Sequence, residues 1–194
     1  MTSCDDPALE VLARARAAGV ERLVTIGSSA AEMAAVTPLL DEPGVLTTAG
    51  LHPNSADQWS DALEALIRER AAHPRCVAIG ETGLDWFRDH VDRATQTDVF
   101  RRQLALAREL GKTVTIHCRD ADAECFDLLV AEGPERVILH CFSVPDRLDE
   151  AVANGWWCSF AGNATYPKAA DLLLAAARCP ADRILLETDA PYLT

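Results

Sequence analysis

Histidine and carboxylate side chains follow several short apolar runs in this sequence. His52, Glu81, His117 and His140 each stand at the end of a run rich in valine, isoleucine or leucine, and Asp189 follows the last such run. Ionic groups next to buried segments are costly unless they are paired or bound to a metal. Imidazole and carboxylate groups are ligands of Zn²⁺, Mn²⁺ and similar ions. The pattern therefore predicts a divalent metal site, provided that the fold brings these run ends together.

Each of these residues also has a structural interpretation. A single histidine at the end of a strand is more often a hydrogen-bonded structural residue. Glu81 alone could cap a helix, and Asp189 alone could accept hydrogen bonds in the following Ala-Pro turn. Cys118 and Cys141 each follow a candidate ligand and could be thiol ligands, but neighbours in a strand point to opposite faces. We therefore expect core positions for both cysteines, and the metal interpretation depends on the whole set.

Helical patterns alternate with apolar runs along the whole chain. The runs that predict strands cover residues 22–27, 45–51, 76–80, 113–117, 137–140, 156–160 and 184–187. This alternation is typical of a parallel sheet covered by helices. Seven regular units favour a TIM-type (β/α)₈ barrel over an open doubly wound sheet, which usually has about six strands. In such barrels the active site lies at the carboxyl ends of the strands, where the polar residues above are found.

The pattern lacks one strand and one helix of a complete barrel. It opens with a helix, and Thr194 follows directly on the last strand. Strand 8 pairs with strand 1 in a closed barrel, so both gaps fall at one seam. We expect residues 1–194 to form a single α/β domain, a (β/α)₈ barrel without strand 1 and helix 8.

Composition limits the classes of function. The 194 residues include 18 basic and 30 acidic side chains, which gives a net charge of −12. A broad basic face for nucleic acid is therefore not expected, although bound metal ions could supply positive charge to a nuclease. No apolar run approaches the roughly 18 residues of a membrane span, and residues 1–7 do not resemble a signal peptide. Seven cysteines, several of them in apolar runs, fit reduced thiols, so we expect a cytoplasmic protein without a membrane partner.

Five short motifs occur in a characteristic order. They are GLHP at 50–53, IGETGLD at 79–85, IHCR at 116–119, HCFS at 140–143 and LETDAPYL at 186–193. Together they resemble the TatD family, the metal-dependent deoxyribonucleases of the amidohydrolase superfamily, over essentially the whole chain. The resemblance implies a hydrolase that cleaves phosphodiester bonds of DNA, with single strands or 3′ ends as substrate.

The resemblance also assigns roles to residues at these positions. It implies two divalent ions (Zn²⁺, Mg²⁺ or Mn²⁺) at the barrel rim, bridged by Glu81. His117 and His140 would complete one site, and Asp189 would belong to the other and act as the catalytic base. His52 and Arg119 would face the scissile phosphate or its neighbours.

One feature of the family is missing. The family opens with a His-x-His strand that supplies two ligands to the first ion, and residues 1–7 contain no histidine. We therefore expect one ion to be retained, held by Glu81, His117 and His140. Two alternatives remain open: another metallohydrolase of the superfamily, acting on a lactone or an amide, and an inactive truncated copy. The oligomeric state is not predicted.

Overall fold

The seven expected strands form one parallel sheet. The computed structural model describes residues 8–88, 90–190 and 192. Along the sheet the strands follow their order in the chain: β1 (Leu23–Thr25), β2 (Val45–Ala49), β3 (Cys76–Asp85), β4 (Thr113–Arg119), β5 (Val137–Leu139), β6 (Trp157–Phe160) and β7 (Ile184–Leu186). Each neighbouring pair is parallel, as successive β–α units require.

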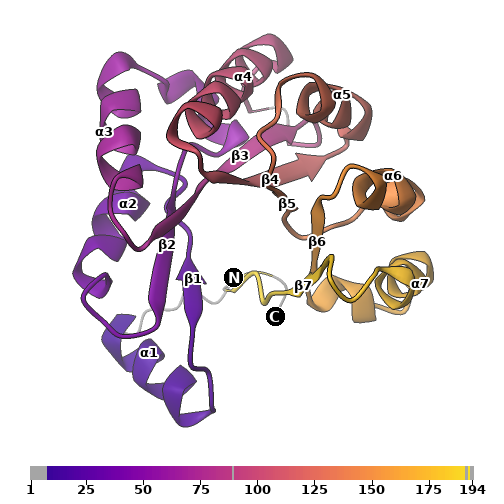
Figure 1. The fold of residues 1–194 in the computed structure, drawn as a ribbon, viewed down its shortest axis with the longest axis horizontal. Helices are drawn as coiled ribbons and strands as arrows, with labels where there is room; N and C mark the ends of the chain where they lie inside the picture. Colours follow the sequence, from indigo (N-terminus) through magenta and orange to yellow (C-terminus); the bar gives the residue numbers. More distant parts are fainter. Residues whose placement is uncertain (1–7, 89, 191, 193–194) are drawn as a thin grey trace.

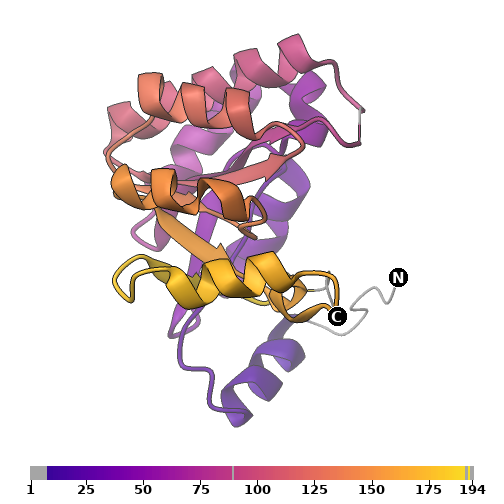
Figure 2. The ribbon, with the colours of Figure 1, turned by 90° about the vertical axis from the view of Figure 1, so that its right-hand side faces the viewer.

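The helices cover the outside of the sheet. They are α1 (Ala8–Ala17), α2 (Ala30–Val36), α3 (Asp61–Ala71), α4 (Arg93–Leu110), α5 (Asp122–Glu132), α6 (Leu148–Ala153) and α7 (Ala170–Arg178). Short 3₁₀ turns lie between them at η1 (Thr37–Leu39), η2 (Pro53–Gln58), η3 (Pro145–Arg147) and η4 (Gly162–Thr165). The sheet curls into an arc, with helices on its convex side (Figure 1). Helices α4 to α7 follow one another along this outer surface (Figure 2).

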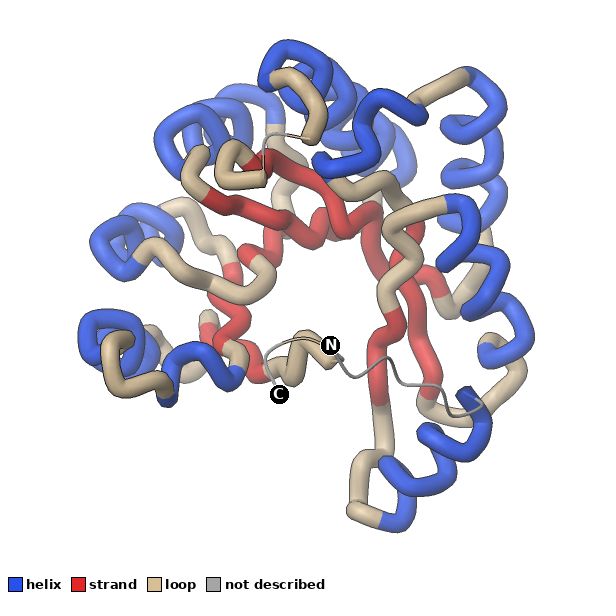
Figure 3. The backbone as a smooth tube through the Cα atoms, turned by 180° about the vertical axis from the view of Figure 1, so that it is seen from behind, coloured by secondary structure: helices blue, strands red, loops and turns tan. Residues whose placement is uncertain are grey.

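The sheet is a partial barrel. In the described part of the chain β1 and β7 are the two edge strands, and no ladder joins them. Seen from behind, the strands line the inside of the arc and the helices surround it (Figure 3). This confirms the predicted α/β fold of the TIM-barrel type. No helix within the described residues is long and apolar enough to cross a membrane.

The main core lies between the sheet and its helices. Helix α4 contributes most to it: Phe100, Leu104 and Ala107 are fully buried, at the spacing of one helix face. Burying side chains such as these contributes about 1.5–3 kcal/mol for each large one. The same face of α4 also carries two buried glutamines, Gln96 and Gln103.

The two glutamines bind the strand ends that carry polar residues. Gln96 accepts a hydrogen bond from Asp85 N at 2.8 Å and donates to Asp85 O at 3.0 Å. Gln103 accepts from Leu51 N at 2.8 Å and donates to Leu51 O at 3.0 Å and to Thr82 Oγ1 at 2.6 Å. Helix α4 therefore fixes the carboxyl ends of β2 and β3.

Candidate metal centre

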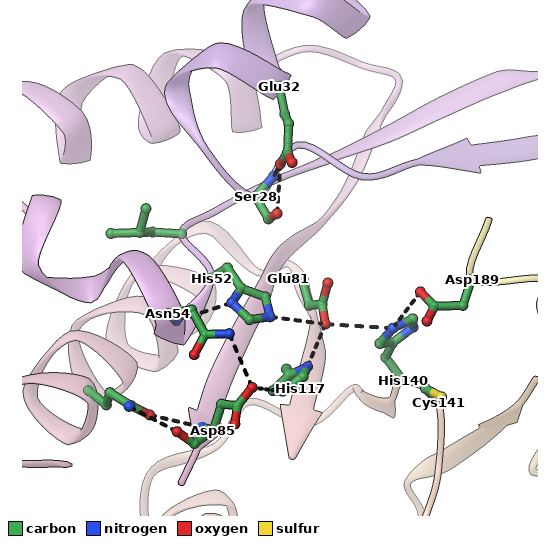
Figure 4. A network of polar contacts seen from close by, with 12 residues as sticks. Ser28, Glu32, His52, Asn54, Glu81, Asp85, His117, His140, Cys141 and Asp189 are labelled. Atoms are coloured by element: carbon green, nitrogen blue, oxygen red, sulfur yellow. Dashed lines mark hydrogen bonds and ion pairs between the residues drawn. The ribbon is translucent and has the colours of Figure 1, made fainter. Parts of the chain in front are cut away.

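A bulge in β3 aims Glu81 at the centre of the site. The register between β3 and β4 shifts between Ile79 and Thr82, so β3 holds one extra residue there. Such a bulge redirects a side chain. Glu81 Oε1 lies 2.9 Å from His117 Nδ1, 3.6 Å from His140 Nε2 and 3.8 Å from His52 Nε2 (Figure 4). One carboxylate oxygen thus faces three imidazole rings.

A glycine permits the close pairing of β3 and β4 beside this carboxylate. Gly83 has φ = +138° and pairs with His117. A Cβ atom at this position would lie 2.0 Å from His117 O. Only glycine fits a backbone with this φ and this contact, so the second glycine of the GETGLD motif holds the backbone of His117 in place.

Two carboxylates flank the imidazole of His117. Its Nδ1 faces Glu81, and its Nε2 lies 3.2 Å from Oδ2 of Asp85, which is fully buried. Asn54 Nδ2 donates to the same Asp85 oxygen at 3.1 Å. The other oxygen, Oδ1, accepts hydrogen bonds from the backbone N–H groups of Phe87 and Arg88. Asp85 is thereby fixed in position and orients the ring.

His140 has an equivalent partner at the end of β7. Its Nδ1 lies 2.9 Å from Glu187 Oε1, which also accepts a hydrogen bond from Cys141 N at 2.9 Å. The other nitrogen, Nε2, lies 3.4 Å from Asp189 Oδ1 and faces Glu81. Each of these two histidines therefore presents one nitrogen to Glu81 and the other to a second carboxylate.

The carboxylates hold protons on both rings. Burial lowers the pKa of His117, but hydrogen bonds with Asp85 and Glu81 outweigh it and raise the pKa to about 9. Burial also lowers the pKa of His140, and hydrogen bonds with Asp189 and Glu187 raise it to about 10. For Glu81, burial raises the pKa, yet the hydrogen bond with His117 and the charge of His140 lower it to about 2.

Within the described residues, the group of possible ligands close enough together for one ion is His52, Glu81 and His117. His140 and Asp189 join this group through the contacts of His140 Nε2 with Glu81 and with Asp189. Nitrogen and oxygen donors of this kind suit Zn²⁺ and related ions. Asp85 and Glu187 meet the outer nitrogens, as the carboxylate partners of metal-binding histidines do.

His52 differs from the other two histidines. Burial and the charge of His117 lower its pKa to about 4, so the ring is neutral. Its Nδ1 accepts a hydrogen bond from Asn54 N at 3.1 Å. The single proton of the neutral ring therefore lies on Nε2, which faces Glu81. Ligand atoms of His52, Glu81 and His117 lie within 4.8 Å of one another, but the proton on Nε2 makes His52 a hydrogen-bond donor there.

Arg119 lies further out on the rim. It follows His117 by two residues on β4 and pairs with Asp85 in the sheet. Its guanidinium carbon lies 3.8 Å from the centre of the Phe87 ring. Arg119 thus packs on Phe87, and no contact with Glu81 is found among the described residues.

One cysteine does not lie where the strand pattern predicts. Both cysteines are partly exposed, but Cys118 packs against the main core and contacts the buried Cys125, whereas Cys141 lies beside His140 (Figure 4). Strand β5 ends at Leu139, and Cys141 has φ = +43°. Strand alternation no longer applies there, so the expected core position was wrong for Cys141. Its Sγ accepts a hydrogen bond from Asn163 Nδ2 at 3.5 Å.

Comparison with known proteins places the chain in a family. The protein-family model described as "TatD related DNase" matches residues 2–194 of the sequence. The chain belongs to this family. It is 40% identical to the 3′-5′ ssDNA/RNA exonuclease TatD of Yersinia pseudotuberculosis, over 95% of this chain and 73% of that protein. It is 38% identical to a metal-dependent hydrolase TatD of Mycobacterium tuberculosis, over 97% of this chain and 75% of that protein.

Solved structures of the TatD family share the fold. A TatD homologue from Escherichia coli superposes with a TM-score of 0.85 at 30% identity, over 95% of this chain and 73% of that one. A TatD family hydrolase from Entamoeba histolytica gives a TM-score of 0.82 at 25% identity and covers 94% of this chain. The chain spans 64% of the length of the Entamoeba protein.

Proposed function

We propose that this chain is a divalent-metal-dependent hydrolase that cleaves phosphodiester bonds of DNA, acting on single strands or 3′ ends. The observation that carries the proposal is the single Glu81 oxygen shared by His117 and His140, with Asp189 in contact with His140. Relatives named as 3′-5′ ssDNA/RNA exonucleases support a nucleic acid substrate. We further propose one catalytic domain over residues 1–194 and a cytoplasmic location.

Four residues would hold the metal. Glu81, His117 and His140 would bind one ion, and Asp189 with the shared Glu81 would contribute to a second. A divalent ion here supplies an activated water and neutralises charge that develops on the phosphate. The two imidazole donors favour Zn²⁺ or Mn²⁺ over Mg²⁺.

The other groups act on the water and the phosphate. Asp189 accepts the proton of the attacking water, because its carboxylate lies beside His140 at the strand ends. His52 donates its Nε2 proton to a phosphate oxygen. Arg119 reaches a neighbouring phosphate oxygen from the rim, as a charge-assisted donor.

Nuclease assays on the metal-loaded protein test the proposal. The protein is loaded with Zn²⁺, Mn²⁺ or Mg²⁺ and given labelled single-stranded DNA, duplex DNA or RNA. We expect degradation of single-stranded DNA that a chelator abolishes. His140→Ala should require more metal for half-maximal activity, because it removes a neutral imidazole donor.

A second histidine provides the matched control. His73 precedes β3, at the other end of this strand, and its Nδ1 accepts a hydrogen bond from Arg75 N. His73→Ala should leave the metal requirement unchanged. Hydrolysis of lactones or amides without phosphodiester cleavage would instead support another metallohydrolase of the superfamily. If the metal-loaded protein hydrolyses none of these substrates, the result would support the alternative of an inactive truncated copy.

A further inference from the structure

One aromatic ring is exposed at the rim of the candidate metal centre. Phe87 exposes 58% of its surface, whereas Phe100, Phe126, Phe142 and Phe160 are all buried. It lies two residues beyond Asp85, where β3 ends. An exposed aromatic side chain beside a polar site is a candidate contact for a ligand rather than part of the core.

The backbone that carries this ring is fixed relative to the metal centre. The N–H groups of Phe87 and Arg88 donate to Asp85 Oδ1 at 3.1 and 3.0 Å. The other oxygen of Asp85 contacts His117. Trp86 N donates to Arg119 O at 2.9 Å and joins this turn to β4. The same carboxylate thus holds both the exposed ring and a candidate metal ligand.

Arg119 covers one face of the ring. Its guanidinium carbon lies 3.8 Å from the ring centre, a cation–π contact. Arg119 and His117 are two residues apart on one strand, so their side chains share a face and lie about 6.6 Å apart along it. The Phe87 ring with Arg119 over it, here called the aromatic platform, therefore lies at the same edge of the sheet as His117.

Positive charge collects at this platform in an acidic protein. The chain carries a net charge of −12, yet Arg119 lies over Phe87, and Arg88, the next residue along the chain, is exposed and its charge lowers the pKa of His52. Within the described residues, neither guanidinium forms an ion pair. Cationic side chains beside an exposed aromatic ring match the way proteins bind single-stranded nucleic acid.

We propose that the open face of Phe87, backed by Arg119, stacks on the unpaired base of the nucleotide next to the scissile phosphodiester. Arg88 then faces the backbone of that strand. The inference rests on the proposed nuclease function. It names the contact through which the protein would select single strands. Inside a duplex both faces of a base are covered by its neighbours, so stacking on a side chain there requires a base that has left the stack. Any base has such a face, so the subsite is expected to be tolerant of sequence.

Binding of intact and abasic oligonucleotides tests this subsite. The probe is a short 5′-labelled single-stranded DNA with phosphorothioate linkages, which slow cleavage, bound to the metal-loaded protein. A second probe lacks the base at the last or the last-but-one nucleotide. Phe87→Leu keeps an apolar side chain but removes the ring. We expect it to weaken binding of the intact probe about 5- to 150-fold. Binding of the abasic probe should hardly change.

An aromatic residue at the opposite end of the sheet serves as the control. Trp157 begins β6, and Arg183 lies over its ring at 5.1 Å. Trp157→Leu removes the same kind of stacked ring far from the metal ligands and should leave DNA binding unchanged. Phe87→Trp should retain base-dependent binding, because it keeps a flat ring at the platform.

Each result distinguishes this inference from the nuclease proposal. Equal binding of the intact probe by the wild type and Phe87→Leu would overturn the subsite. Equal weakening of both probes would also overturn it, because the ring would then not act through the base. Turnover of unmodified DNA is measured in parallel. Base-dependent binding without any turnover would support the subsite and overturn the nuclease proposal.

Discussion

Asp85 Oδ2 lies 3.2 Å from His117 Nε2, while the Nδ1 atom of the same ring lies 2.9 Å from Glu81 Oε1. The imidazole therefore has an inner nitrogen, which faces the shared carboxylate, and an outer nitrogen, which faces a buried one. An outer carboxylate fixes the orientation and tautomer of a metal-binding histidine and makes it more basic. We therefore expect Asp85 to act as a positioning residue through His117.

Replacing Asp85 by asparagine should weaken metal binding. The amide keeps the size of the side chain and one oxygen for the N–H groups of Phe87 and Arg88. It then presents an NH₂ donor to His117 Nε2, which disfavours the proton on that nitrogen. We expect Zn²⁺ affinity to fall about 10- to 100-fold, as measured by competition with a chromophoric chelator.

A second aspartate controls for the change in charge. Asp92 caps α4 and accepts a hydrogen bond from Thr95 N. Asp92→Asn removes the same charge and keeps the cap, so its Zn²⁺ affinity should equal that of the wild type. If Asp85→Asn behaves like Asp92→Asn, Asp85 does not position the ligand.

Metal binding should release protons at neutral pH. The pKa of His117 is raised to about 9 and that of His140 to about 10, so both rings are protonated in the metal-free protein at pH 7. Binding requires neutral rings, and about two protons should leave per ion. Metal affinity should therefore rise with pH up to the raised pKa values. Calorimetry in buffers of different ionisation enthalpy measures the proton count. No release at pH 7 would contradict the raised pKa values.

The stability of the metal-free protein provides an independent check on the same two rings. Their folded pKa values lie above the ordinary 6.5 of histidine. The stabilisation from the charged rings is therefore fully present below pH 6.5 and is lost as the pH rises toward 9 to 10. The free energy of unfolding of the chelator-treated protein in urea should therefore fall as the pH rises over this range. In His117→Gln this fall should be smaller.

The sequence predicts the strands and their order well, because β–α alternation and apolar runs depend on local pattern. It also indicates His117, which ends an apolar run of β4. It does not predict the orientation of Glu81, because the bulge in β3 depends on pairing with β4. Nor does it indicate that β3 continues to Asp85, since the polar run after Gly80 looks like a loop.

Other contributors depend on tertiary contacts that no motif reports. Glu187 ends the last predicted strand, but only the fold brings it to His140. Asn54 follows the GLHP motif, and its contact with Asp85 crosses from η2 to β3. Gln96 and Gln103 interrupt the apolar face of α4, where polar residues are unexpected. That interruption is the signal that could have revealed their role.

Gln103→Leu should destabilise the protein although it adds an apolar side chain to a buried position. The amide of Gln103 pairs both backbone groups of Leu51 and the hydroxyl of Thr82. Leucine leaves these buried groups without partners, at a cost of about 1–3 kcal/mol for each. The free energy of unfolding in urea should fall by several kcal/mol. Gln58→Leu, at an exposed position, should change it little. A stability equal to that of the wild type would show that the strand ends do not depend on α4.

Gly83→Ala should reduce both stability and metal affinity, because a methyl group would collide with the backbone of a ligand. The added Cβ would lie 2.0 Å from His117 O, and φ at this position is +138°. The strands must move apart to relieve the contact, which moves His117 away from Glu81.

Gly111 provides the control for the effect of the backbone conformation alone. It follows the last residue of α4 with φ = +61°, and a Cβ there meets nothing within 4 Å. Gly111→Ala should cost about 1–2 kcal/mol from the left-handed backbone alone, with Zn²⁺ affinity unchanged. Urea unfolding and chelator competition on both variants measure the two quantities. If Gly83→Ala loses stability like Gly111→Ala and keeps its Zn²⁺ affinity, then the close pairing of β3 and β4 does not position His117.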